Sequence, residues 1–348
     1  MGLPTAADIT RWIRKAVIAS AALVVTVTLL GAWLLHNRPS LENLGQSVPP
    51  LDELPADSVT VTWFGVSTLL FDDGETQVLI DGFFSRPSMA DLVFDVPVSS
   101  HAARINYVMD EYQMRRLAAI IPSHSHYDHA MDIGALANRS SASILGSPSS
   151  AQIARGAGVS EDQIVVATEG ESYEFGNFSV TLLRSRHAPI AWGGSTPFAG
   201  TIEQPLRQPA PASAWRAGES YSVVVEHPLG RTLVQSSAGF IEGALGGIRA
   251  DVVMLGIFGL DGLGSEYTER YWRELVTSTG ASRVFPIHFD DSTLPLGEAR
   301  AYPRIIHDLG DTARLIDAFR QIWDTDTRIY WPELGRPSLL FGPEAPEA

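Results

Sequence analysis

The chain has 348 residues, 45% of them hydrophobic and 19% charged, a composition too apolar for general disorder. Its formal net charge of -15 at pH 7 disfavours nucleic acid as a partner, because an acidic surface repels a phosphate backbone. Cysteine is absent and Lys15 is the only lysine, which excludes thiolate ligands, cysteine nucleophiles and Schiff-base chemistry in the folded domain.

Residues 16–35 form an uncharged run, AVIASAALVVTVTLLGAWLL, which as a helix spans roughly 30 Å, the thickness of a hydrocarbon core. Arg11, Arg14 and Lys15 precede it, so the positive-inside rule predicts a cytoplasmic segment 1–15 and a periplasmic or other extracytoplasmic remainder. We expect a retained signal-anchor. A cleaved signal peptide is the alternative, although the run is longer than the usual apolar region of about 7–15 residues and ends without a small-residue cleavage site.

Residues 36–57 are polar, rich in proline and without hydrophobic periodicity. This pattern predicts a linker that holds the following domain, residues 58–348, off the bilayer.

Short β-type runs and helical stretches follow in turn along the chain. Runs at 59–64, 67–71 and 77–81, separated by glycine-containing turns, predict an antiparallel meander. We expect further strands at 118–124, 143–146, 163–167, 172–175, 178–187, 222–227, 232–237, 252–257 and 283–288, with 222–227 and 232–237 forming a hairpin. Helices are expected near 130–138, 148–156, 266–278 and 312–323. This alternation predicts an α/β layered domain rather than an all-β sandwich.

Two stretches, 83–100 and 190–220, match no regular element and are long for structureless loops, which are often functional lids. Trp192, Phe198 and Trp215 lie in the second stretch. Aromatic residues there either line a substrate pocket or pin the loop to the surface, and pinning is the more common role.

The most informative segment is IIPSHSHYDHAMD, which contains His124, His126, Asp128 and His129 between an expected strand and an expected helix. Residues 124, 126 and 128 alternate at period two, so in an extended segment they share one face, and the helix start then turns His129 inward. Imidazole and carboxylate groups suit Zn²⁺ and neighbouring divalent ions. The segment therefore predicts a metal centre.

With this segment the chain resembles the metallo-β-lactamase superfamily, whose hallmark is His-x-His-x-Asp-His after a β-strand. The resemblance extends from about residue 59 to 330 and implies a four-layer αββα sandwich, here preceded by one transmembrane helix. It adds Asp81 in VLIDGFF as a bracing carboxylate, His187 in LLRSRHAP and His288 in VFPIHFDD. It implies one metal ion on His124, His126 and His187 and a second on Asp128, His129 and His288. The implied cofactor is one or two Zn²⁺ ions, with Mn²⁺ or Fe²⁺ as alternatives.

The chain departs from the family pattern at one position. Where the family places a bridging aspartate, LVQSSAGF has Ser237, whose neutral hydroxyl is a poor ligand for a divalent ion. We therefore expect the second metal ion to bind weakly. Asp290 or Asp291, just after His288, is hypothesised to compensate, with Asp290 on the same face of an extended strand.

The remaining histidines are weaker candidates. His101 is a candidate proton donor near the site, although histidines on loops are commonly exposed without such a role. We expect His36 and His227 to be boundary and turn residues and His307 to lie on the surface.

The expected chemistry is hydrolysis of an ester, lactone, amide or phosphodiester bond in a small-molecule or lipid-derived substrate. A bound Zn²⁺ lowers the pKa of its water from 15.7 to about 7 and polarises a carbonyl or phosphoryl oxygen. Asp128 and His129 are the expected catalytic residues. Asp128 either ligates a metal ion or accepts a proton from the nucleophilic water. The resemblance is to the broad lactonase and phosphodiesterase-like branch.

Two other classes of function stay open. A metal-stabilised binding or assembly module would keep these ligands for folding alone. Redox chemistry at a di-iron centre usually needs an electron-carrier domain, which nothing in this sequence resembles. None of these patterns bears on the oligomeric state.

Overall fold

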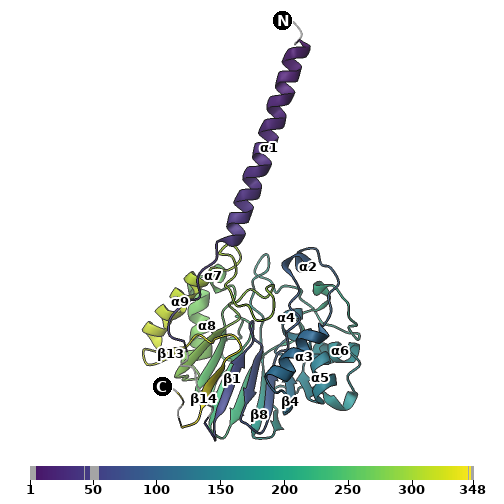
Figure 1. The fold of residues 1–348 in the computed structure, drawn as a ribbon. Coiled ribbons are helices and arrows are strands. Elements are labelled where there is room, and N and C mark those ends of the chain that lie inside the picture. Colours follow the sequence, from purple (N-terminus) through teal and green to yellow (C-terminus); the bar gives the residue numbers. More distant parts are fainter. Residues whose placement is uncertain (1–4, 43, 48–54, 344, 346–348) are drawn as a thin grey trace.

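A helix of 31 residues, α1 (Ala6–His36), leads away from the rest of the chain in the computed structural model (Figure 1). The structure describes residues 5–42, 44–47, 55–343 and 345, so parts of the predicted cytoplasmic segment (1–4) and linker (43 and 48–54) lie outside the described residues. α1 contains the predicted apolar run, and its stretch Ile9–His36 is long and apolar enough for one membrane crossing.

Two sheets, each of seven strands in the described part of the chain, form the body of the domain. In spatial order the first contains β14 (Pro337–Phe341), β1 (Val59–Trp63), β2 (Leu69–Asp72), β3 (Gln77–Ile80), β4 (Leu117–Ile121), β5 (Ser143–Gly146) and β6 (Ile164–Val166). The second contains β13 (Arg328–Ile329), β12 (Arg283–Ile287), β11 (Val252–Gly256), β10 (Gly230–Gln235), β9 (Ser220–His227), β8 (Phe178–Ser185) and β7 (Ser172–Phe175).

Each sheet is mixed, with an antiparallel part and a parallel part. The predicted meander is confirmed, because β1, β2 and β3 pair antiparallel, and so is the predicted hairpin of β9 and β10. β3 to β6 and β10 to β13 pair in parallel. The carboxyl ends of the parallel strands within each sheet therefore point to one edge, which is where ligands bind in open α/β sheets.

Helices cover the outer faces of both sheets (Figure 1). The first sheet is covered by α3 (Ala102–Glu111), α4 (Tyr127–Ala130), α5 (Ile133–Ser140) and α6 (Pro148–Gly156), with α2 (Met89–Val93) nearby. The second is covered by α7 (Leu260–Leu263), α8 (Ser265–Trp272), which continues as a π-helical turn (Arg273–Thr277), and α9 (Leu309–Trp323). Short 3-10 turns occupy Glu161–Gln163 and Ala212–Ala214. The predicted αββα order is confirmed.

Neighbouring residues of β4 show how the layers are separated. Ile121 packs into the core between the two sheets, whereas Ile120 packs against α3, α5 and α6 on the outer face. A strand with apolar side chains on both faces is buried on both, which explains the unbroken apolar run in the sequence.

Several elements differ from the sequence-based expectation. The helix predicted near 130–138 is two helices, α4 and α5, and α3, β13 and β14 were not predicted. β13 has two residues and β14 begins with a proline, so neither presents a period-two pattern of useful length.

The segment after α1 is docked on the domain, whereas the sequence predicted a spacer over residues 36–57. The Arg38 guanidinium donates to the Asp291 carboxylate at 2.7 Å. The Arg304 amide donates to the Asn37 carbonyl at 2.9 Å. The end of α1 is therefore held against the loop that follows β12.

Candidate metal centre

The six ligands predicted from the sequence lie at one edge of the sandwich. His124 and His126 follow β4, His187 follows β8, and His288 follows β12 directly. The remaining two, Asp128 and His129, lie in the short helix α4. Side chains at the ends of strands are held more rigidly than side chains on long loops.

The turn after β4, rather than an extended strand, aligns the His124 segment. The sequence predicted a strand over 118–124 with residues 124, 126 and 128 on one face, but β4 ends at Ile121. His126 is the N-cap residue of α4, with φ -63° and ψ 156°. The period-two argument was therefore wrong in its mechanism, although the side chains converge.

The structure brings the six side chains together as two groups of three. In each group, one potential ligand atom per residue lies within 4.8 Å of the others, and the two groups are His124, His126, His187 and Asp128, His129, His288. The rings of His124 and His129 join the groups, with centroids 3.8 Å apart. This division matches the one implied by the family resemblance.

In the first group, His126 and His187 each donate one ring N–H to a backbone carbonyl outside the cluster. The Nε2–H of His126 donates to the Pro197 carbonyl at 2.9 Å, and the Nδ1–H of His187 donates to the Ala188 carbonyl at 2.8 Å. A neutral imidazole has one donor and one acceptor nitrogen, so the other nitrogen in each ring is a lone-pair acceptor. Such outward hydrogen bonds orient histidine ligands in metal sites.

A divalent cation fits this arrangement. Nδ1 of His126 lies 3.1 Å from Nε2 of His124, and the outward donation of His126 leaves Nδ1 without a proton. Burial lowers the pKa of His126 to about 4 and that of His187 to about 3, so both rings are neutral at pH 7. Burial, reinforced by the neighbouring histidines, also lowers the pKa of His124 well below its ordinary value. Clustered neutral imidazoles are the donor set of zinc-type sites.

The second group contains an ionised carboxylate. Oδ2 of Asp128 lies 3.6 Å from Nε2 of His129 and 3.5 Å from Nε2 of His288. Burial tends to raise the pKa of Asp128, but the two histidines outweigh burial and hold it below its ordinary value. Burial tends to lower the pKa of His129, but Asp128 and Asp81 outweigh it and raise that pKa.

Asp81 has the bracing contacts that the resemblance implies. It is fully buried, and its carboxylate accepts hydrogen bonds from Nδ1 of His129 at 2.8 Å, the Ser67 hydroxyl at 2.6 Å and the Ser123 amide at 2.7 Å. Ser67 was missed by the sequence analysis, because a serine at the start of an expected strand carries no distinguishing pattern.

Asp290 and Asp291 do not compensate for the missing bridging acid, contrary to the hypothesis. The Asp290 carboxylate accepts from the Val66 amide at 2.6 Å and pairs with Arg86 at 3.3 Å, while Asp291 pairs with Arg38. The strand predicted over 283–288 ends at Ile287, and His288 itself has φ 57°, so the chain is not extended from His288 to Asp290 as the hypothesis assumed. This left-handed turn breaks the alternation that would have aligned Asp290 with His288.

Ser237 lies at the cavity, where its hydroxyl accepts from the Ala188 amide at 3.0 Å. Of the weaker candidates, His101 is exposed, caps the N-terminus of α3 and does not line the cavity. His36 and His227 end α1 and β9, as predicted. The expectation for His307 was wrong: it is fully buried and pairs with Asp261 at 2.7 Å, because the long loop before α9 folds back over α7.

A cavity of about 160 Å³ opens beside the two groups. Four candidate ligands, His126, Asp128, His187 and His288, line it together with Tyr127, Phe198, Phe258, Ser292 and Tyr302. Burial raises the pKa of Tyr127 and Tyr302, so both phenols are neutral hydrogen-bond donors. Tyr127 lies within the histidine motif and was open to prediction, whereas Tyr302 lies in a segment without any pattern.

The aromatic residues of the unassigned stretch 190–220 have three different environments. Phe198 lines the cavity, with its ring centroid 6.1 Å from that of His126. Trp215 is fully buried and pins the loop to the outer core of the first sheet. Trp192 is 99% exposed, so it neither lines the cavity nor pins the loop to the domain.

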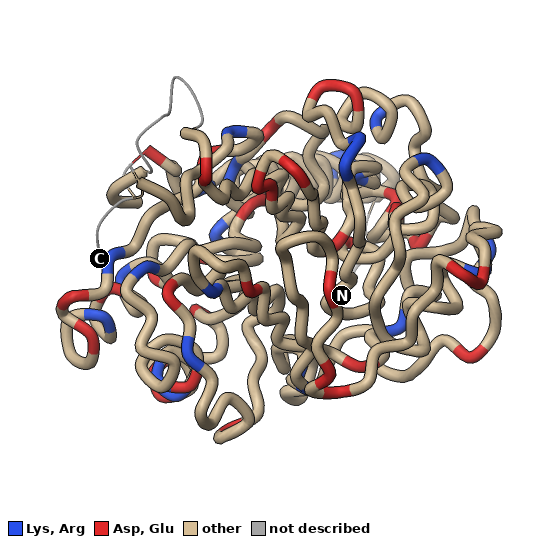
Figure 2. The backbone as a smooth tube through the Cα atoms, turned by 90° about the horizontal axis from the view of Figure 1, so that it is seen from below, with Lys and Arg blue, Asp and Glu red and all other residues tan. Residues whose placement is uncertain are grey.

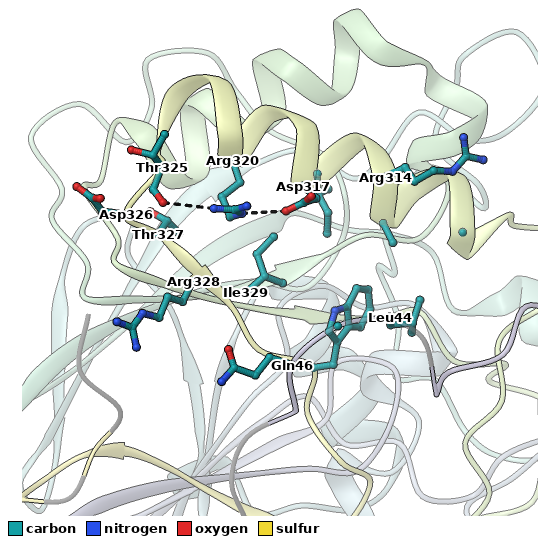
Figure 3. Close-up of a pocket in the computed structure, with 15 residues that line it drawn as sticks. Leu44, Gln46, Arg314, Asp317, Arg320, Thr325, Asp326, Thr327, Arg328 and Ile329 are labelled. Carbon is teal, nitrogen blue, oxygen red and sulfur yellow. Dashed lines mark hydrogen bonds and ion pairs between the residues drawn. The ribbon is translucent and has the colours of Figure 1, made fainter.

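A wider cavity lies elsewhere, between α9, β13 and the segment around Gln46 (Figure 3). Its volume is about 840 Å³, and Arg320 pairs along α9 with Asp317, one turn earlier in the helix, at 2.9 Å. None of the described residues that line it belongs to either ligand group, so its size does not make it the candidate active site.

The comparisons with known proteins agree with this geometry. The family model described as the metallo-beta-lactamase superfamily matches residues 61–207. A protein of Roseiflexus sp. (strain RS-1) named as a metal-dependent hydrolase is 29% identical over 135 residues, 37% of this chain and 48% of the relative, so the match spans about half of that relative. A second protein with the same name, from Heliobacterium modesticaldum, is 24% identical over 252 residues, which are 72% of this chain and 91% of the relative.

Among solved structures, a metallo hydrolase from the hyperthermophilic archaeon Ignicoccus hospitalis superposes with a TM-score of 0.51 at 13% identity, covering 82% of this chain and 100% of that one. At this identity the likeness establishes a shared fold.

Proposed function

We propose that this chain, a member of the metallo-beta-lactamase superfamily, is a metal-dependent hydrolase tethered to a membrane by α1. The observation that carries the proposal is the convergence of ligand atoms from three strand ends and one short helix, within 4.8 Å in each group. The scissile bond is an ester, lactone, amide or phosphodiester, and the substrate is a small or lipid-derived molecule. The basic residues before the apolar run support, by the positive-inside rule, a catalytic domain on the extracytoplasmic side.

His124, His126 and His187 would hold one ion and Asp128, His129 and His288 a second, with Zn²⁺ favoured and Mn²⁺ or Fe²⁺ as alternatives. When bound, a divalent ion supplies ionised water near neutral pH and polarises the oxygen of a carbonyl or phosphoryl group.

The residues around the cavity supply the rest of the chemistry. Asp128 is ionised and lines the cavity, so its carboxylate can accept the proton released on attack. The neutral hydroxyls of Tyr127 and Tyr302 can donate hydrogen bonds to the substrate or a proton to the leaving group. Phe198 and Phe258 exclude water from one side of the cavity.

Metal analysis of the full chain in detergent, combined with turnover of p-nitrophenyl butyrate, a γ-lactone and bis(p-nitrophenyl) phosphate, tests the proposal. Chelation should abolish turnover of at least one probe, and added Zn²⁺ or Mn²⁺ should restore it. His187→Asn should lower metal content and reduce kcat/KM by more than the 10–100-fold typical of an outer-shell change. His227→Asn, a histidine at the end of another strand, should change neither.

The alternatives give different results. Chelator-sensitive melting without turnover of any probe would favour a metal-stabilised binding module. A purified chain that binds no divalent ion, with melting unaffected by chelators, would refute both readings.

A further inference from the structure

The edge of the domain that carries the metal centre lies directly at the end of α1. α1 ends at His36, and two residues later the Arg38 guanidinium donates to the Asp291 carboxylate at 2.7 Å and to the Ala301 carbonyl at 2.8 Å. Two residues of extended chain span at most about 7 Å. The loop that begins at His288 is therefore held close to the point where the apolar helix ends.

Large apolar side chains are exposed on three loops at this edge. Phe94 caps α2 and is 77% exposed, Trp192 is 99% exposed, and Ile305 is 62% exposed. α2 and α7 lie at the end of the domain from which α1 leaves (Figure 1). Ile305 follows Arg304, whose amide donates to the carbonyl of Asn37, the first residue after α1. Single exposed apolar residues are ordinary, but Trp192 follows Ala191, which lines a cavity together with Leu263 of α7, so all three belong to segments at this end of the domain.

A largely apolar cavity lies beside the metal centre at this end of the domain. Its volume is about 510 Å³, and its lining includes Pro189, Ile190, Ala191, Phe258, Leu263 and Ile306. Ile190 and Phe258 also line the smaller cavity beside the metal ligands, so the two cavities adjoin. Ile306 follows the exposed Ile305, which brings the outer wall of the apolar cavity to the same loop.

We propose that this edge docks on the bilayer, with Phe94, Trp192 and Ile305 at the lipid interface, and that the site takes amphiphilic substrates from the membrane. The apolar chain of the substrate lies between Ile190 and Ile306, and its hydrolysable group reaches the ligand groups. The substrate half of this inference rests on the proposed function.

The charge distribution favours apolar insertion over attraction to anionic head groups. Acidic and basic positions are interspersed along the domain (Figure 2), and acidic residues outnumber basic ones, 40 to 25. Clusters of four to eight basic residues, which mark recognition of anionic lipids, do not occur in the chain. Indole and phenyl side chains partition into the interface without such charges. Neutral phosphatidylcholine should therefore suffice as the docking surface.

Fluorescence of the full chain in phosphatidylcholine vesicles tests the docking. Subtracting the emission of Trp192→Phe from that of the native chain isolates the Trp192 signal, and brominated acyl chains should quench most of it. Trp323, 41% exposed at the C-terminal end of α9, provides the control through Trp323→Phe, and its signal should stay unquenched. An unquenched Trp192 would refute the docking.

Chain-length dependence tests the substrate class. The vesicle-bound, metal-loaded chain should hydrolyse p-nitrophenyl laurate with a kcat/KM at least about tenfold above that for p-nitrophenyl butyrate, since eight more methylenes are buried. Ile306→Trp should abolish this preference by filling the apolar cavity. Ile322→Trp, at an exposed isoleucine on α9, should keep it.

The two failures are distinguishable. Equal kcat/KM for the two esters, with turnover still dependent on metal, refutes the amphiphile inference and leaves the proposed function intact. Loss of all metal-dependent turnover refutes the proposed function, while the quenching of Trp192 still decides whether the edge docks.

Discussion

The Nδ1–H of His129 donates to the Asp81 carboxylate at 2.8 Å, and this bond leaves Nε2 of the same ring facing Asp128. One buried carboxylate thus fixes which nitrogen of a candidate ligand is free for a metal ion. Asp81 has φ 58°, a left-handed conformation that asparagine also tolerates.

Asp81→Asn should therefore keep the backbone and weaken the metal site. The amide is neutral and stabilises the required ring orientation less well, so we expect metal affinity to fall about 10–100-fold. Isothermal titration of the chelated protein with Zn²⁺ measures the change. Asp132→Asn is the matched control, because Asp132 is equally buried but bonds to the amides of Phe84 and Ser85, outside the ligand groups. Equal losses in the two variants would contradict the bracing role.

Ser237→Asp should strengthen binding of the second ion. A carboxylate at this position would add negative charge beside both groups, where the native hydroxyl only accepts from the Ala188 amide. We expect the variant to bind nearly two metal ions per chain at metal concentrations at which the native chain binds fewer than two. Inductively coupled plasma analysis after gel filtration measures it, with Ser236→Asp as the neighbouring control. Unchanged stoichiometry would show that the missing acid does not limit the second site.

Asp290→Ala should cost stability without changing metal content. Arg86 and Asp290 are both buried, and removal of one partner leaves an uncompensated charge, which typically costs about 3–5 kcal/mol. Asp291→Ala should cost less, because its partner Arg38 is 23% exposed. Denaturant unfolding gives the free energies, and metal analysis of both variants gives the stoichiometry. A lower metal content in both would revive the compensation hypothesis.

The metal-free protein should lose stability as the pH falls from about 6.5 to about 4. In this window the unfolded chain protonates His126 and His187, whereas the folded chain, with a pKa of about 4 and about 3 for these rings, does not. Stability rises with pH wherever the unfolded state binds more protons, by up to about 1.4 kcal/mol per pH unit for each ring. The raised pKa of His129 does not oppose this, because its contribution is complete below its unfolded value and is lost only at higher pH.

Thermal melting in chelator at several pH values between 4.5 and 7.5 measures this slope. His187→Asn should make it shallower, since one of the rings with a lowered pKa no longer titrates. A slope identical to that of the native chain would show that other groups cause the loss of stability.

The sequence by itself determined most of the local elements and the candidate ligands of the histidine motif. The apolar alternation of β1 to β3 and the hairpin of β9 and β10 depend on contacts between chain neighbours, which periodicity reports directly. The motif from His124 to His129 is equally local. His187 and His288 were found only through resemblance, because an isolated histidine at a strand end carries no pattern of its own.

The tertiary structure decided every feature that depends on distant partners. Arg86 pairs with Asp290 and Arg38 pairs with Asp291, so neither carboxylate is free to bind a metal ion. Hydrophobic periodicity in the sequence does not predict such ion pairs. The buried position of His307 and the docking of the segment after α1 have the same origin. Hydrogen bonds and ion pairs between residues far apart in the sequence depend on how the two sheets and their helices pack, and that packing is a property of the whole chain.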